Sequence, residues 1–129
     1  MRILLVEDDL VLRVGLKEAL EQANFTVDPL GAAEPAEGAL GLTTYDLAII
    51  DIGLPGMDGF ELIRRIRRRG LDLPILILTA RDALEDLLTQ IARNPAVGEV
   101  TVMAHSMGTW LAVEALRQRS YDVVLMDVQ

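Results

Sequence analysis

The chain has 129 residues, of which 51% are hydrophobic and 25% are charged, with a formal net charge of −8 and no cysteine. This composition excludes a disordered chain, a disulfide framework and a thiolate metal site, and no apolar run approaches the roughly 20 residues that span a bilayer. The negative charge argues against non-specific nucleic-acid binding, so we expect one cytoplasmic domain over residues 1–129 without a nucleic-acid or membrane partner.

Short apolar runs alternate with helical patterns from one end of the chain to the other. Several of the runs are continuously apolar, which is typical of strands that helices cover on both faces of a sheet. Six strands are expected, in chain order at Arg2–Val6, Phe25–Asp28, Tyr45–Asp51, Leu73–Thr79, Glu99–Ala104 and Tyr121–Val128.

Five helices are expected between these strands, and their ends carry recognisable capping residues. The first runs from Asp9 to about Ala23, and the second lies within Ala32–Leu42. The third begins at a capping box of Asp58 and Glu61, and the fourth at a capping box of Asp82 and Glu85. The fifth runs over Met107–Arg119. The alternation implies right-handed crossovers and a mainly parallel sheet with helices on both faces. We therefore predict a doubly wound α/β fold with three layers, α/β/α.

One basic run stands out in this acidic chain. Five arginines between positions 64 and 69 precede Gly70. The run is either an anion or nucleic-acid patch or the solvated end of a helix, where cations complement the helix dipole and glycine caps the last turn. We favour the helix end.

Three acidic residues fall at the carboxyl ends of expected strands, where loops of a parallel sheet build sites. Glu7 and Asp8 follow the first strand, and Asp51 ends the third. In a sheet of order 2-1-3-4-5 these two strands are neighbours, so the carboxylates would repel unless a cation lies among them. A hard ion such as Mg²⁺ meets that need, and Asp51 could then attack a phosphoryl group. The alternative is a set of solvated loop carboxylates.

Three segments resemble the receiver domain of bacterial response regulators, and the resemblance covers about residues 1–86. They are VEDD at Val6–Asp9, IIDIGLPGMDG at Ile49–Gly59 and ILTA at Ile77–Ala80. The resemblance implies a flavodoxin-like fold with a histidine kinase as phosphoryl donor. It also implies roles for five residues: Asp51 as phosphoryl acceptor, Glu7 and Asp8 as the Mg²⁺-binding pair, the Gly53 carbonyl as a further ligand, and Thr79 as the switch hydroxyl.

The chain departs from the receiver pattern at the fifth strand. Receivers place a lysine followed by proline at its end, where the cation pairs with the phosphoryl group. The single lysine here is Lys17, inside the first expected helix, and positions 102–108 read VMAHSMG. We therefore expect the metal pocket to survive with weak Mg²⁺ affinity, but without productive phosphorylation.

The segment Val100–Leu116 resembles the strand, nucleophile elbow and helix of α/β-hydrolases. Ala104-His105-Ser106-Met107-Gly108 has the small residues that this tight turn requires. A serine nucleophile also needs a base, and the only histidine directly precedes Ser106. Ser106 is thus predicted to be vestigial, and the chain is predicted not to be an enzyme.

The last residues, Tyr121–Gln129, repeat the pattern of Tyr45–Gly53, and positions 112–129 resemble a helix and strand of a second receiver. We interpret the chain as an engineered chimera in three pieces: 1–86 receiver-like, 87–114 hydrolase-like and 115–129 receiver-like. The sixth strand is expected beside the fifth or beside the second, and the first placement would leave a sheet face bare and favour self-association. Two alternatives remain open: a working receiver with Asp51 as acceptor, and a vestigial serine hydrolase with Ser106.

Overall fold

The computed structural model describes residues 1–79, Thr89, Arg93 and residues 100–104. Over this part the chain alternates between strands and helices, as the apolar pattern predicts. The elements are β1 (Arg2–Val6), α1 (Leu10–Gln22), β2 (Thr26–Leu30), α2 (Ala33–Leu42), β3 (Leu47–Asp51), α3 (Gly59–Arg68), β4 (Ile75–Thr79) and β5 (Val100–Ala104).

The strands form one sheet in the order β2-β1-β3-β4-β5, and every pairing is parallel. This confirms the predicted flavodoxin-like fold and its 2-1-3-4-5 order. The strand order changes direction between β1 and β3, which makes the carboxyl ends of these two strands the switch point where doubly wound folds bind ligands. The expected helices from Asp82 and over Met107–Arg119, and the expected sixth strand at Tyr121–Val128, lie outside the described residues.

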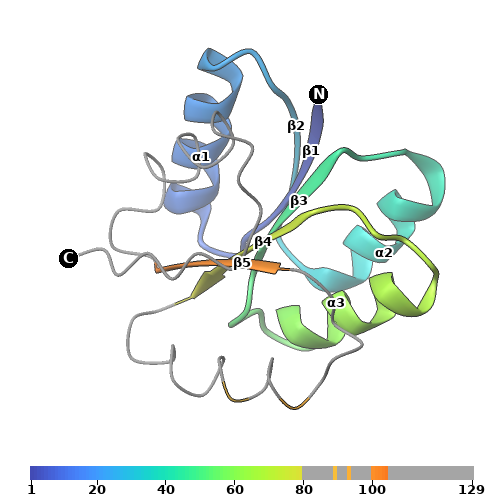
Figure 1. Ribbon diagram of the computed structural model, residues 1–129. Coiled ribbons are helices and arrows are strands. Elements are labelled where there is room, and N and C mark those ends of the chain that lie inside the picture. Colours follow the sequence, from blue (N-terminus) through green and yellow to red (C-terminus); the bar gives the residue numbers. More distant parts are fainter. Residues whose placement is uncertain (80–88, 90–92, 94–99, 105–129) are drawn as a thin grey trace.

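Helices cover both faces of the sheet. Helix α1 lies on one face, and α2 and α3 lie on the other (Figure 1). Successive residues of β1 serve the two faces in turn, because side chains alternate along a strand. Ile3 and Leu5 pack in the core with two buried leucines of α1, whereas Leu4 and Val6 pack in the core with α2 and α3. A strand buried on both faces explains the continuous apolar run.

The ends of the helices follow the capping residues. Asp9 accepts the N–H of Leu12 at 3.0 Å at the start of α1, and Asp58 accepts the N–H of Glu61 at 2.8 Å at the start of α3. Helix α3 stops before Gly70, whose φ of 76° is left-handed and therefore suits glycine. None of the described helices is long and apolar enough to cross a membrane.

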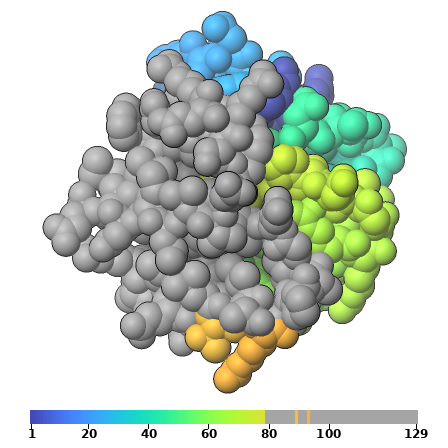
Figure 2. All heavy atoms as spheres, in the orientation of Figure 1, coloured from blue at the N-terminus to red at the C-terminus, as the bar shows by residue number. Residues whose placement is uncertain are grey.

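The arginines of α3 pair with glutamates of the same layer. Arg64 contacts Glu61 at 2.7 Å, and Arg65 contacts Glu37 of α2 at 3.2 Å. Helices α2 and α3 lie next to each other on the molecular surface, in teal and yellow-green (Figure 2). These ion pairs favour the solvated helix end over a nucleic-acid patch.

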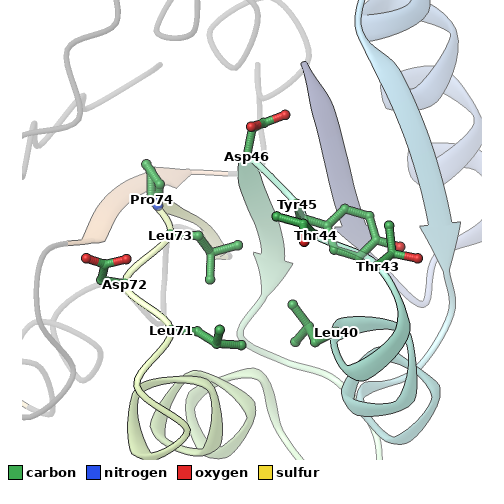
Figure 3. A pocket seen from close by; sticks show the side chains of 9 residues that line it. All are labelled: Leu40, Thr43, Thr44, Tyr45, Asp46, Leu71, Asp72, Leu73 and Pro74. Atoms are coloured by element: carbon green, nitrogen blue, oxygen red, sulfur yellow. The ribbon is translucent and has the colours of Figure 1, made fainter.

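A cavity of about 400 Å³ opens at the amino ends of β3 and β4 (Figure 3). Leu40, Leu71 and Leu73 line its apolar part, and Asp46 and Pro74 mark where β3 and β4 begin. The cavity is therefore at the opposite edge of the sheet from the acidic residues of the switch point.

Candidate metal centre

The register of β1 and β3 brings the predicted acidic residues together. Val6 is the partner of Ile50, so the next residues, Glu7 and Asp51, reach the carboxyl edge of the sheet side by side. Glu7 leaves β1 with its N–H bonded to the Leu30 carbonyl of β2 at 3.0 Å. The sheet itself, rather than a mobile loop, fixes the backbone of both residues.

Oxygen atoms of Glu7, Asp8 and Asp51 lie within 4.8 Å of one another. Glu7 is fully buried and Asp51 is only 5% exposed, whereas Asp8 faces solvent. Exposed acidic loops are common, but two buried carboxylates beside a third are costly without a cation. Three carboxylate oxygens are hard donors of the kind that Mg²⁺ binds. The residues present thus fit a divalent cation, and the structure brings the three predicted carboxylates together at the carboxyl ends of β1 and β3.

The surroundings of Glu7 hold its side chain in place. Asp9 donates its N–H to Glu7 Oε1 at 3.0 Å, and Arg13 Nη1 of α1 donates to the Glu7 carbonyl at 2.8 Å. The sequence did not single out Arg13. The signal in the sequence for Arg13 is its spacing from Asp9. Residues four apart lie on the same side of a helix, so Arg13 lies on the side of α1 that begins at Asp9.

Burial raises the pKa of Glu7 from 4.5 to about 8. Burial is the largest cause of this rise. The Asp9 N–H acts in the opposite direction, and the neighbouring carboxylates of Asp51 and Asp8 contribute to the same rise to about 8. A carboxyl group with so high a pKa is mostly protonated at neutral pH. The raised pKa marks the place where a bound cation would be most stabilising, because the cation would favour the ionised form.

The loop after β3 orients Asp51. Gly53 donates its N–H to Asp51 Oδ1 at 3.0 Å, and Ile52 donates its N–H to the Leu78 carbonyl of β4 at 3.0 Å. The first of these bonds places the Gly53 N–H against the Asp51 carboxylate. The role of the Gly53 carbonyl as a metal ligand stays a prediction.

The other predicted residues have different outcomes. Thr79 is the last residue of β4, one position beyond the partner of Asp51, so its backbone lies at the same edge of the sheet. Its role as a switch hydroxyl stays a prediction. His105 and Ser106 lie outside the described residues. Lys17 lies on α1 and pairs with Glu21 at 2.6 Å, so this lysine is already paired on the helix.

Comparisons with known proteins identify the family. The sequence model described as "Response regulator receiver domain" matches residues 3–101. The transcriptional regulatory protein QseB of Escherichia coli O157:H7 is 46% identical over 86 residues, which are 67% of this chain and 39% of QseB. The transcriptional regulatory protein PhoP of Escherichia coli K12 is 38% identical over 120 residues, which are 93% of this chain and 53% of PhoP.

A solved structure has the same fold. The response regulator protein TrrA of Thermotoga maritima, in complex with Mg(2+)-BeF, is 28% identical with a TM-score of 0.72. The match covers 90% of this chain and 96% of TrrA. By contrast, the chain spans from two fifths to about half of the length of QseB and PhoP.

These matches correct three predictions. The chimera receives no support, because one family model continues through about half of the segment assigned to a hydrolase and the PhoP alignment covers nearly the whole chain. The prediction that the chain is not an enzyme is wrong, because its relatives have receiver domains that accept phosphoryl groups. The expected lack of a nucleic-acid partner conflicts with relatives named as transcriptional regulators. The chain belongs to the response regulator receiver domain family.

Proposed function

We propose that the chain accepts a phosphoryl group on Asp51 in a phosphorelay, with Glu7, Asp8 and the Gly53 carbonyl holding Mg²⁺. One observation carries the proposal: three carboxylates, two of them buried, lie within 4.8 Å at the switch point of the sheet. TrrA, which has the same fold, was solved in complex with Mg(2+)-BeF, and this supports a Mg²⁺-dependent site in the present chain.

Asp51 would act as the nucleophile. One of its carboxylate oxygens attacks the phosphorus of the donor, the bond from phosphorus to the donor's leaving group breaks, and the leaving group departs with the electron pair. The N–H of Gly53 binds Asp51 Oδ1 and so orients the carboxylate for the attack. Bound Mg²⁺ would neutralise the negative charge that develops on the phosphoryl oxygens.

The phosphoryl donor is proposed to be a histidine kinase, and Thr79 is proposed to sense the modification through its hydroxyl. Because QseB and PhoP are named as transcriptional regulators, we propose that the receiver controls transcription. A single domain over residues 1–129, a cytoplasmic location and self-association remain predictions.

The proposal is tested by incubating the chain with acetyl phosphate and Mg²⁺ and recording the intact mass. The wild type should gain the mass of one phosphoryl group, and Asp51→Asn should not. Asp72→Asn is the matched control, because Asp72 is an exposed aspartate at the opposite edge of the sheet. A wild type that stays unmodified, or an Asp51→Asn variant that is modified like the control, would contradict the proposal.

A further inference from the structure

The start of helix α3 lies against the backbone of the proposed phosphoryl acceptor. Gly59 is the first residue of α3 and is buried. Its N–H donates to the Ile52 carbonyl at 3.2 Å, which closes the loop between β3 and α3. The same loop supplies the Gly53 N–H that holds the Asp51 carboxylate. One short loop therefore links the position of α3 to the position of the Asp51 side chain.

No space exists for a side chain at Gly59. A Cβ atom built on its backbone would lie 2.1 Å from the Asp51 carbonyl oxygen, 2.9 Å from the Asp51 carbonyl carbon and 2.9 Å from the Ile52 Cα. All three contacts are with backbone atoms, so a rotamer change cannot relieve them. Either α3 or the end of β3 would have to move.

The buried face of helix α3 opposes a movement away from the sheet. Four of its apolar side chains are buried in the core between the sheet and the helices: Phe60, Leu62, Ile63 and Ile66. Moving them out of contact would open cavities in a close-packed interior. A larger residue at position 59 would therefore press on the backbone of Asp51 and Ile52, because α3 cannot withdraw without losing these buried contacts.

We infer that Gly59 is a positioning residue of the acidic site: without a side chain, it lets α3 lie against the Asp51 carbonyl and so fixes the Asp51 carboxylate relative to Glu7 and Asp8. The inference rests on the proposed function for its consequence, because a shift of Asp51 matters where three carboxylates share one cation. Metal sites need their ligands placed within a few tenths of an ångström.

The test uses Gly59→Ala in a stabilised background. Gly15 and Gly38 lie inside α1 and α2, and a Cβ at either position meets nothing within 4 Å. Gly15→Ala/Gly38→Ala should raise the urea midpoint, because alanine favours helix over glycine. This double variant is both the matched control for a glycine-to-alanine change and the background in which Gly59→Ala is expected to fold.

Two measurements are made on each protein: the Mg²⁺ dissociation constant by calorimetry and the Gly53 amide resonance by NMR. The control should match the wild type in both. Gly59→Ala in the same background should remain folded, weaken Mg²⁺ binding by about tenfold or more, and shift the Gly53 resonance. Unchanged affinity and an unchanged resonance would overturn the inference, and so would a variant that fails to fold, since Gly59 would then serve the fold alone.

The proposed function can fail separately. If the wild type binds no Mg²⁺, the proposal of a Mg²⁺ site is refuted. The Gly53 resonance of the metal-free protein still reports whether Gly59 positions Asp51, because that amide is bonded to the Asp51 carboxylate.

Discussion

The buried Glu7 predicts that the metal-free protein loses stability as the pH rises. The folded chain holds the Glu7 proton up to a pKa of about 8, whereas an unfolded glutamate loses it near 4.5. Below the lower value both states are protonated and the stability is complete. Between the two values the folded state binds more protons, so the free energy of unfolding falls with increasing pH.

The loss in the free energy of unfolding follows from the difference between the pKa values of Glu7 in the folded and unfolded states. Each pH unit between the two pKa values changes the free energy of unfolding by about 1.4 kcal/mol, so about 3 to 4 kcal/mol should be lost between pH 5 and pH 8. Bound Mg²⁺ should remove most of this loss, because it needs the ionised carboxylate. The dissociation constant of Mg²⁺ should in turn fall about tenfold for each unit by which the pH rises toward pH 8.

Urea unfolding at pH 5, 6.5 and 8 measures the effect in chelator and in excess Mg²⁺. Glu7→Gln should lack the pH-dependent loss, and the exposed Glu18 supplies the control variant Glu18→Gln, which should behave like the wild type. Subtracting the Glu7→Gln values from those of the wild type removes the contribution of titrating groups that do not interact with Glu7. A difference that stays constant from pH 5 to pH 8 in chelator would refute the assigned role of Glu7.

Three further changes test other parts of the structure. Ile63→Ala removes a fully buried side chain from α3 and should lower the free energy of unfolding in urea by about 2 to 5 kcal/mol; a loss well below that range would mean that α3 packs loosely. Asp58→Ala removes the cap on the Glu61 N–H and should cost about 1 kcal/mol, and an unchanged urea midpoint would argue against the cap. His105→Lys places a cation directly after Ala104, the partner of Thr79, and should speed labelling by acetyl phosphate about tenfold; equal mass-labelling rates would show that the lysine missing from the receiver pattern does not limit the reaction.

The succession of strands and helices along the chain was predictable because its signals are local and repeated. Apolar runs marked the strands, and Asp9 and Asp58 marked where α1 and α3 begin. The end of β2 was less predictable. The expected strand ended at Asp28, directly before Pro29, but β2 continues to Leu30. Among the described strands β2 is an outermost strand, with a neighbour on one side only. A proline there can lack its N–H without breaking a hydrogen bond between strands.

The residues of the site were predictable from the sequence, but the burial and the pKa of Glu7 were not. Strand ends indicated that Glu7 and Asp51 would be neighbours, because adjacent parallel strands end at one edge. The full burial of Glu7 depends on residues distant in sequence, and the pKa follows from that burial. No local pattern contains this information.

The hydrolase interpretation shows the limit of local motifs. Small residues around Ser106 indicated a nucleophile elbow, yet the strand before it, β5, pairs in parallel with β4 as part of the receiver sheet. A strand, a tight turn and a helix form the same crossover in both families. Such a motif therefore reports the crossover and not the chemistry, which depends on groups elsewhere in the chain.

The acidic cluster is itself an argument for function. A sheet edge selected for stability alone would not bury Glu7 beside Asp51, since the buried carboxyl groups oppose each other's ionisation. At the helix caps and in the core strands, by contrast, local preference and packing agree: Asp9 and Asp58 cap helices, and the core strands carry apolar side chains. The unfavourable burial of charge is concentrated where a cation and a phosphoryl group would use it.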